Sequence, residues 1–225
     1  MNLPTILDWL NRLDGWRGFP TLYLLMLTAV IITVAFEWRV SIFALMVHYF
    51  LLGLLLVDLL EPRLAMVKLL TGLFVCLMLY FTGRQVNWGR AVSPKLMQLS
   101  LGKRTVPLTA PVRAGVILLI GAVVLGMSQL SFFQLPLLEG RGAYLNTAVY
   151  LLTLLGILGI LLSAADPFQA GLGLLLFVAG FELYYSSIAQ TTTMLIVFVS
   201  VNFIITLIVS TLTQLHFIKP PLPSK

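Results

Sequence analysis

Hydrophobic residues fill long uninterrupted runs along most of the chain, and short polar segments separate these runs. A run needs about 20 consecutive apolar residues to cross the hydrocarbon core of a bilayer, and it crosses as a helix because an unpaired backbone cannot lie in lipid. The pattern therefore predicts seven transmembrane helices, at residues 19–36, 40–60, 64–82, 113–134, 144–164, 168–189 and 191–214. The break at Ala189 and Gln190 is the weakest, so a count of six stays open.

The chain before the first long run is amphipathic. Its apolar positions recur every three or four residues, and Trp9 and Trp16 suit the depth of the membrane interface. We expect a helix over residues 1–18 that lies in the interface, and the two tryptophans favour it over a frayed polar terminus. The segment lacks a basic start followed by an apolar core and a small-residue cleavage site, so a cleaved signal peptide is not expected.

These runs and breaks predict the organisation of the chain. We expect an interfacial helix at 1–18, a three-helix membrane unit at 19–82, a basic cytoplasmic loop at 83–112, a four-helix membrane unit at 113–214 and a tail at 215–225. The last three helices of the second unit form a triplet over 144–214. Each triplet has a charged residue near the junction of its second and third helices, a similarity too faint to define a repeat.

Composition places the chain firmly among integral membrane proteins with an all-α fold. Hydrophobic residues make up 60% of the chain and charged residues 10%, with a mean hydropathy of +1.03, whereas a soluble domain has about 45–50% apolar and about 25% charged residues. The longest stretch between runs contains Pro94, Pro107 and Pro111 and leaves no room for a soluble catalytic domain. The single cysteine, Cys76, lies in an apolar run and is interpreted as a packing residue.

The net charge of +6 reflects membrane topology and does not imply nucleic acid. With seven spans, four basic residues lie on one side of the membrane and nine on the other. The first side holds Arg12, Arg17, Arg63 and Arg141, and the second holds Arg39, Arg84, Arg90, Lys95, Lys103, Arg104, Arg113, Lys219 and Lys225. We therefore expect a multi-pass protein of the inner (plasma) membrane, with its N-terminus outside and its C-terminus in the cytoplasm.

One carboxylate, Glu182, lies well inside the apolar run from Gly171 to Ser187. A charged side chain deep in a bilayer costs about 2.5–3.5 kcal/mol on insertion scales, so it usually faces protein or water and has a function. On a helix, Tyr185 and Ser186 share its face, and Gly171 lets a neighbouring helix approach closely. Burial disfavours the charged form of a carboxyl group, so we interpret Glu182 as an acid that exchanges a proton. The alternative is a carboxyl group that only pins two helices or lies at the interface.

The last predicted helix has one polar stripe on an otherwise apolar surface. Its members, at spacings of three and four residues, are Asn202, Thr206, Ser210 and Thr213 or Gln214. Such a stripe either joins helices, with each hydrogen bond worth about 0.6 kcal/mol on average, or lines a wet path. Joining helices is the commoner role, and a cavity shared with Glu182 is the functional alternative.

The second and third predicted helices carry further candidates for an ion path. His48 lies near the middle of its span, and Lys68 lies more than one turn inside the next, after Asp58, Glu61 and Arg63. Lys68 is close enough to a helix end to extend its ammonium to the interface, where Asp58 and Glu61 could pair with it and mark the boundary. For these three residues we favour that role over a polar path. For His48, a structural hydrogen bond and a proton relay are weighted equally.

The chain offers no signature of a catalytic or cofactor site. It lacks an HExxH motif, a glycine-rich phosphate loop followed by Lys and Ser or Thr, and a serine nucleophile elbow. The two histidines, His48 and His216, lie on distant segments, so no metal or haem site is expected. Asp166 and Pro167 are interpreted as a helix start.

The segment Gly180-Phe181-Glu182-Leu183, in the second helix of the final triplet, resembles the G-x-E-L segment of the small K-type subunit of respiratory NADH:quinone oxidoreductase. In that family the acid belongs to a chain of intramembrane ionisable residues associated with proton translocation. The helix from Met194 to Ser210 is similar in pattern to the last helix of the C subunit of multisubunit sodium/proton antiporters. Component E subunits of membrane-bound hydrogenases look like longer relatives. The chain departs from the K-type pattern in its last helix, where Asn202 and Thr206 stand in place of a second acid.

The resemblance implies a non-catalytic membrane subunit of a proton- or cation-translocating redox or antiporter complex. It would bind no cofactor, its partners would be other membrane subunits and the bilayer, and Glu182 is the one residue that the resemblance places in an ion path. From the residue patterns we add Asn202, Thr206, His48 and Lys68 as candidates for that path. One alternative is a scaffold or assembly subunit in which the polar residues only hold helices together. Another is a small stand-alone transporter, which is disfavoured because no convincing pair of broken helices faces a midplane site.

Overall fold

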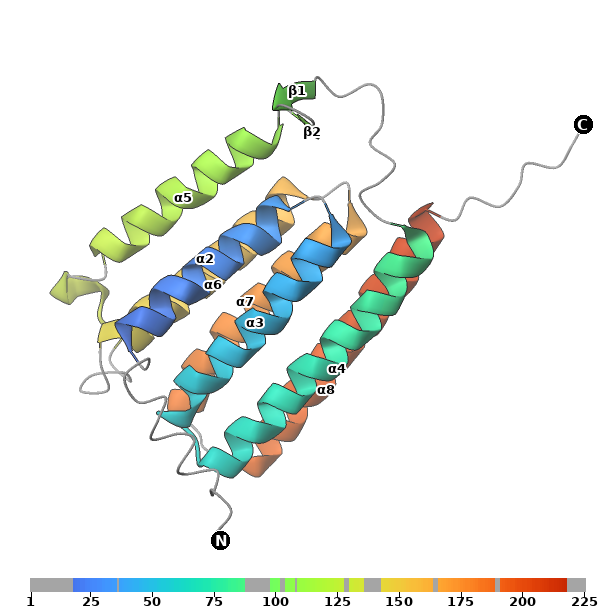
Figure 1. Ribbon diagram of the computed structural model, residues 1–225. Coiled ribbons are helices and arrows are strands. Elements are labelled where there is room, and N and C mark those ends of the chain that lie inside the picture. Colours follow the sequence, from blue (N-terminus) through green and yellow to red (C-terminus); the bar gives the residue numbers. More distant parts are fainter. Residues whose placement is uncertain are drawn as a thin grey trace, which may run out of the picture.

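Seven α-helices make up most of the computed structural model, which describes residues 18–35, 37–87, 98–101, 104–107, 109–127, 130–135, 143–163, 166–188 and 191–217. The helices are α2 (Phe19–Val34), α3 (Trp38–Val57), α4 (Pro62–Val86), α5 (Thr109–Met127), α6 (Ala143–Leu162), α7 (Pro167–Ile188) and α8 (Thr192–Phe217) (Figure 1). A 3-10 helix, η2 (Ser131–Phe133), follows α5. The helical fold class is confirmed, with one small addition: strands β1 (Gln98–Leu101) and β2 (Arg104–Pro107) pair as an antiparallel hairpin within the predicted basic loop.

Helix length separates the seven helices into two groups. Five of them, α3, α4, α6, α7 and α8, are long and apolar enough to cross a membrane. With 16 residues and a rise of 1.5 Å per residue, α2 is about 24 Å long, less than the hydrocarbon core of about 30 Å. The apolar part of α5, Pro111–Met127, is similarly short, and α5 ends seven residues before the predicted boundary at 134. The predicted interfacial helix at 1–18 lies outside the described residues, apart from Gly18.

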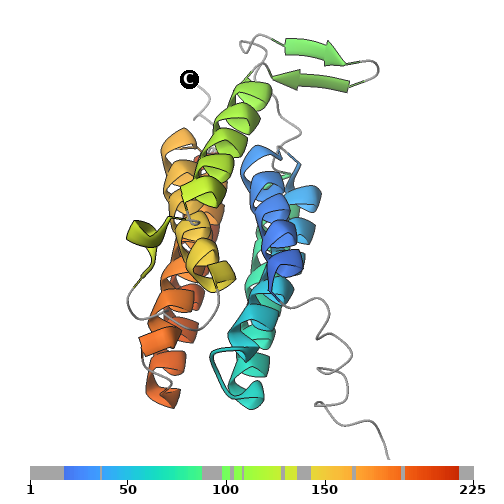
Figure 2. The ribbon, with the colours of Figure 1, turned by 90° about the vertical axis from the view of Figure 1, so that its left-hand side faces the viewer.

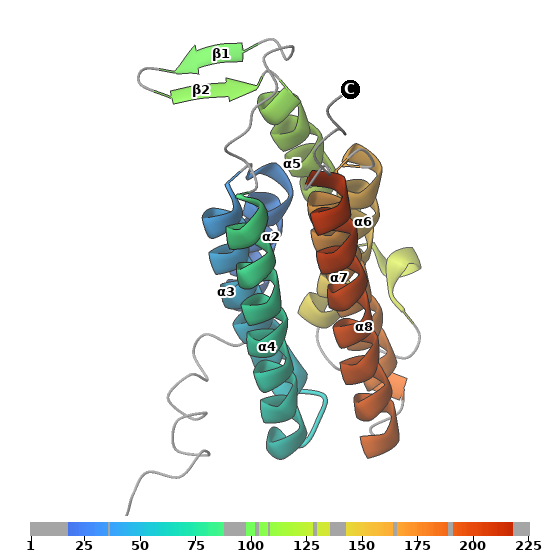
Figure 3. The ribbon, with the colours of Figure 1, turned by 90° about the vertical axis from the view of Figure 1, so that its right-hand side faces the viewer.

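The long helices form two layers. Helices α2, α3 and α4 pack side by side in one layer, and α6, α7 and α8 form the other, with α5 against α6 and α2 (Figures 1 and 2). Across the layers α2 contacts α6, α3 contacts α7 and α4 contacts α8, and the two members of each pair run in the same direction (Figures 1 and 3). The three helices of one layer thus have the same order and directions as the three helices of the other, although the sequences of the two triplets show only a faint similarity.

Local sequence explains where several of these helices begin and end. Proline occupies the first turn of α2 and of α4, where its missing N–H would be unpaired in any case. Before α7, the Oδ1 atom of Asp166 accepts hydrogen bonds from the backbone N–H groups of Phe168 and Gln169 at 3.0 and 3.4 Å. The predicted helix start at Asp166 and Pro167 is therefore confirmed. At the end of α4, Asn87 adopts a left-handed conformation with φ of 54°, as helix C-caps often do.

Helices α6 and α7 make the most extensive contact of any helix pair in the described bundle. Glycines at their interface allow this close approach. A Cβ atom on Gly156 would collide with the backbone of Phe177, and one on Gly173 would lie 2.7 Å from the backbone nitrogen of Ile160. A Cβ atom on Gly180 would likewise lie 2.8 Å from the backbone nitrogen of Thr153. Small residues of this kind let membrane helices approach to backbone contact, so α6 and α7 form a fixed, closely packed pair.

Candidate functional site

Lys68 of α4 and Glu182 of α7 form an ion pair inside the bundle. The Nζ atom of Lys68 donates a hydrogen bond to Oε2 of Glu182. Lys68 is 0% exposed and Glu182 is 2% exposed. Charged residues are almost never fully buried unless they are paired, so each of these side chains depends on the other for its position.

The pair lies at one end of the bundle because of where its helices begin and end. Lys68 follows the start of α4 at Pro62 by six residues, and Glu182 precedes the end of α7 at Ile188 by six. At 1.5 Å per residue both lie about 9 Å from a helix end. We had expected Lys68 to extend its ammonium to the interface, and this expectation is wrong: the side chain turns inward, because a buried carboxylate offers its charge a partner.

Tyr49 of α3 links this pair to α8. Its ring centroid is 5.5 Å from Nζ of Lys68, a geometry in which the face of the ring attracts a cation. Its hydroxyl donates a hydrogen bond of 3.0 Å to Oδ1 of Asn202, and its ring packs directly over Gly72 of α4, where any Cβ atom would collide with it. Four helices, α3, α4, α7 and α8, thus meet at one buried polar cluster.

The predicted polar stripe of α8 faces the bundle. Asn202 and Thr206 are buried, with exposed fractions of 1% and 0%. Asn202 donates to the carbonyl of Phe198 at 2.8 Å, and Thr206 donates to the carbonyl of Asn202 at 2.6 Å. Two further members contact α4: Ser210 accepts from the hydroxyl of Thr82 at 2.9 Å, and Gln214 donates to Gln85 at 2.8 Å. At least part of the stripe therefore joins helices, as the sequence favoured.

A small cavity borders Glu182 near the end of α7 and the start of α8. Its polar walls are Glu182, Tyr185, Ser186 and Thr191, and its apolar walls are Leu60, Met194, Leu195 and Phe198. Its volume of about 10 Å³ is at the lower limit for one water molecule. The Glu182 side chain therefore contacts Lys68 and also borders a small space whose walls are partly polar and partly apolar.

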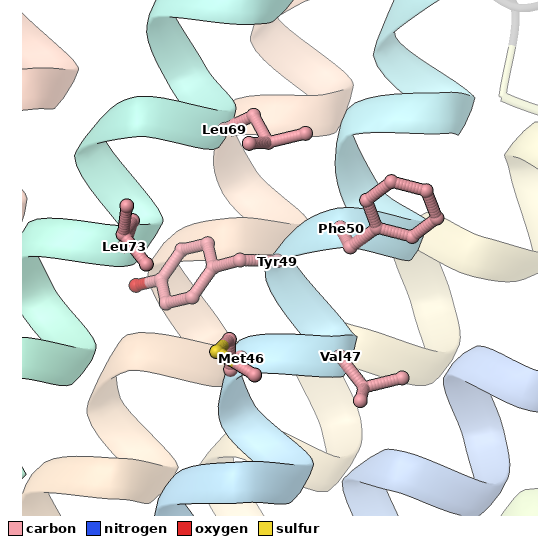
Figure 4. A pocket seen from close by; sticks show the side chains of 6 residues that line it. All are labelled: Met46, Val47, Tyr49, Phe50, Leu69 and Leu73. Carbon is pink, nitrogen blue, oxygen red and sulfur yellow. The ribbon is translucent and has the colours of Figure 1, made fainter.

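A larger groove lies on the outer face of the bundle between α3 and α4, and its volume is about 330 Å³ (Figure 4). Its lining is apolar apart from one hydroxyl, and consists of Met46, Val47, Tyr49, Phe50, Leu69 and Leu73. The hydroxyl of Tyr49 points toward α4 (Figure 4). The ring of Tyr49 thus borders both this apolar groove and the ammonium of Lys68.

His48 does not join the Lys68–Glu182 pair. Its Nδ1 atom is 2.9 Å from the hydroxyl oxygen of Thr28 on α2. That hydroxyl donates its hydrogen to the carbonyl of Leu25, so Nδ1 acts as the donor and Nε2 is left as a buried acceptor with no described partner. Because Tyr49 follows His48 directly, the two side chains leave α3 on different sides, and His48 holds α2 against α3.

Three further charged residues lie between the end of α3 and the first turn of α4. Asp58 accepts a hydrogen bond of 3.0 Å from the hydroxyl of Tyr144 on α6. Glu61 is the exposed residue before α4, and its side chain makes no capping hydrogen bond there. Arg63 lies in the first turn of α4 and is exposed. Glu61 and Arg63 are therefore not buried with the Lys68–Glu182 pair.

A second polar cluster joins four helices at the opposite end of the bundle. Arg113 of α5 donates to Oε1 of Gln169 at 2.7 Å and to the carbonyl of Leu162 at 2.5 Å. Gln169 in turn donates to the carbonyl of Thr33 at 2.9 Å. The planar guanidinium group of arginine has several donors and suits such a multiple contact. These hydrogen bonds join the ends of α2, α5, α6 and α7.

Sequence reasoning missed Tyr49, Thr82 and Gln169. Tyr49 lies inside an apolar run beside His48, and its hydroxyl was the available signal. Thr82 and Gln169 are uncharged and lie near helix ends, where polar residues are ordinary. Among the described residues no group of three or more His, Cys, Asp or Glu side chains could hold a metal ion. No family model, curated protein or solved structure matches the chain.

Proposed function

We propose that this chain is an integral membrane subunit of a complex that moves protons, or less readily another cation, across the bilayer. The buried Lys68–Glu182 pair carries the proposal. Two opposite charges inside a membrane bundle require partners of good geometry, because burial of each ion costs several kcal/mol. Ionisable residues at membrane depth mark ion pathways and proton relays by default.

The size of the neighbouring cavity favours a proton as the transported species. At about 10 Å³ the space beside Glu182 accepts one water molecule and is too small for an organic solute. A water there would deliver a proton to the carboxylate of Glu182 and remove it again. Protonation of Glu182 would leave the ammonium of Lys68 without its counter-charge. The protonation states of the two residues are therefore coupled.

The topology that we propose has seven spans. Five helices satisfy the length requirement, and α2 and α5 complete the alternation of helix directions although they are short. In the described part of the chain, Arg39, Arg84, Arg104 and Arg113 belong to the helix ends and the hairpin at one end of the bundle (Figure 1). The positive-inside rule would place that end in the cytoplasm and the start of α2 outside.

Membership of a larger complex is proposed on two grounds. The resemblance around Gly180-Phe181-Glu182-Leu183 is to small subunits that work beside other membrane subunits, and the chain would act as one of them without a cofactor. In addition, α8 presents many large exposed apolar residues on its outer face, among them Ile196, Ile204, Leu207 and Leu212. Lipid or a neighbouring subunit would cover such a face.

The test is proton translocation by the complex that carries Glu182→Gln. The amide keeps the shape of the carboxyl group and still accepts a hydrogen bond from Lys68, but it cannot release a proton. Because the Lys68 ammonium loses its counter-charge, we expect a less stable complex, and we expect the fraction that assembles to have lost most of its proton flux in proteoliposomes. Glu61→Gln is the matched control, because Glu61 is exposed at the start of α4, and we expect its flux to equal that of the wild type.

Two outcomes would contradict the proposal. If Glu182→Gln assembles and translocates protons at the wild-type rate, Glu182 is not a relay. If Glu182→Ala loses assembly while Glu182→Gln keeps both assembly and flux, the pair only holds helices together and the scaffold interpretation stands in its place.

A further inference from the structure

Four polar side chains of α8 are spaced along the bundle from Tyr49 to its far end. Asn202, Thr206, Ser210 and Gln214 follow one another at intervals of four residues, and residues four apart on a helix have Cβ atoms about 5–6 Å apart. With their partners Tyr49, Thr82 and Gln85 they form the polar seam. The seam begins at a hydroxyl next to the Lys68 ammonium and ends at Gln214 and Gln85, which are not buried.

The spacing of the seam is suited to water. One water molecule with two hydrogen bonds of about 2.8 Å bridges groups that are about 5–6 Å apart. A hydroxyl that donates to a backbone carbonyl, as Thr206 does, still has lone pairs that accept from water. No glycine of α4 holds the backbones of α4 and α8 in contact, so water would enter this interface by displacing side chains.

Tyr49 stands where the ion pair meets the seam. Its ring lies over the Lys68 ammonium and against Gly72, and its hydroxyl is held by Asn202. The ring is fixed in place by Gly72, so the hydroxyl is the part of this side chain that can turn. A turn of the hydroxyl away from Asn202 would offer its oxygen to a water beside Lys68.

We propose that the polar seam is the second half of the proton route, which leads from the Lys68–Glu182 pair to the end of the bundle that bears the β1–β2 hairpin, with the Tyr49 hydroxyl as the positioning group at its entrance. This inference rests on the proposed function of the pair. It adds the direction of the route, the residues that line it and the residue that controls access to it.

The proton transfers balance in three steps. A hydronium in the cavity beside Glu182 gives its proton to the carboxylate and becomes water. The Lys68 ammonium, now without a counter-charge in an apolar environment, gives a proton to a seam water held by Tyr49, which becomes hydronium and passes the charge along the seam. The neutral amine of Lys68 then takes the proton of the Glu182 carboxyl, and the ion pair is restored. One proton has moved from the cavity to the seam.

The first test measures water in the seam and does not depend on proton flux. Single cysteines are placed at Thr206 and Ser210 in the full-length chain carrying Cys76→Ala, and oriented vesicles are treated from the hairpin side with a small hydrophilic methanethiosulfonate. We expect both to react, at rates at least tenfold above that of Leu207→Cys, whose side chain is on the outer face of α8. Equal rates for Ser210→Cys and Leu207→Cys would overturn the seam as a water path.

The second test asks whether Tyr49 controls the route. Tyr49→Phe keeps the ring over Lys68 and removes the hydroxyl, so we expect flux through the reconstituted complex to fall about tenfold, the equivalent of one hydrogen bond of about 1.4 kcal/mol. Infrared bands of carboxyl protonation at Glu182 should persist. The matched control is Tyr23→Phe, on the exposed face of α2, with unchanged flux. Wild-type flux in Tyr49→Phe, together with lost flux in Glu182→Gln, would overturn the role of Tyr49 and leave the proposed function standing, whereas wild-type flux in both would remove the proposed function itself.

Discussion

Two interfaces of this bundle hold helices together by opposite means. Between α6 and α7, glycines bring the two backbones into contact, with Gly156 against Phe177 and Gly180 against Thr153. Between α4 and α8, side chains such as Thr82 and Ser210 meet through hydrogen bonds. Packed backbones cannot exchange a neighbour for water without separating, whereas hydroxyl and amide groups can. The α6–α7 interface is therefore held by backbone contact, whereas the α4–α8 interface is held by hydrogen bonds of the kind that the proposed water route needs. The Lys68–Glu182 pair joins α4 to α7, one helix from each interface.

The largest loss of stability is expected when one charge of the Lys68–Glu182 pair is removed. Lys68→Met leaves the carboxylate of Glu182 buried without a counter-charge, and removal of one partner of a buried ion pair costs about 3–5 kcal/mol. We expect the free energy of unfolding, measured by denaturant titration in bicelles, to fall by that amount. The double variant Lys68→Met with Glu182→Leu should recover most of the loss, because the unpaired charge is gone. Equal stability of Lys68→Met and the wild type would contradict the burial of the pair.

A smaller but clear loss is expected at the glycine interface. Gly156→Ala places a methyl group against the backbone of Phe177, and overpacking of this kind costs about 1–3 kcal/mol. Gly126→Ala on α5 is the matched control, since a Cβ atom there has nothing within 4 Å, and alanine in place of glycine stabilises a helix by up to about 1 kcal/mol. If both variants unfold at the same denaturant concentration, the close contact between α6 and α7 does not contribute measurably to stability.

The polar interface should lose less when one of its contacts is removed. Thr82→Val keeps the shape of the side chain and deletes its hydrogen bond to Ser210, so we expect a loss of about 0.6 kcal/mol. Thr211→Val serves as the control on α8, because Thr211 is exposed and bonds only to the carbonyl of Leu207 in its own helix among the described contacts. A loss at Thr82 as large as that at Gly156 would erase the contrast between the two interfaces.

The smallest effect is expected at the open end of the seam. Gln214→Ala removes a hydrogen bond to Gln85, which is exposed, and substitutions at such positions usually change stability by less than about 0.5 kcal/mol. The same unfolding titration measures it. A loss above 1 kcal/mol in that titration would show that the end of the seam is held as firmly as its middle.

Much of the fold could be predicted because hydrophobic runs report helix number and order directly. Length and composition alone predicted the course of α3, α4, α6, α7 and α8, and Asp166 marked the start of α7. The hairpin was not predicted, since its strands are four residues each and lie in a segment that the charge pattern already explained. The early end of α5 was not predicted because Leu130, Phe132 and Phe133 keep the segment after Met127 partly apolar.

The site was harder to predict because its members are distant in sequence. Glu182 was identified because a charged side chain in a bilayer is energetically costly. The stripe of α8 was identified because its polar residues recur every three or four positions, so local sequence was sufficient for both. The partner of Glu182 was not, since 114 residues separate it from Lys68 and only the packing of α4 beside α7 and α8 brings them together. The inward turn of Lys68 depends on that partner, whereas the distance of Lys68 from a helix end favoured the interface.

Unequal helix lengths give this bundle a thin flank and a thick one. At 1.5 Å per residue, the 16 residues of α2 span about 24 Å and the 26 residues of α8 span about 39 Å. Hydrophobic mismatch on this scale is relieved by tilting and by local thinning of the bilayer. In a bilayer, the lipid beside α2 would therefore be thinner than the lipid beside α8.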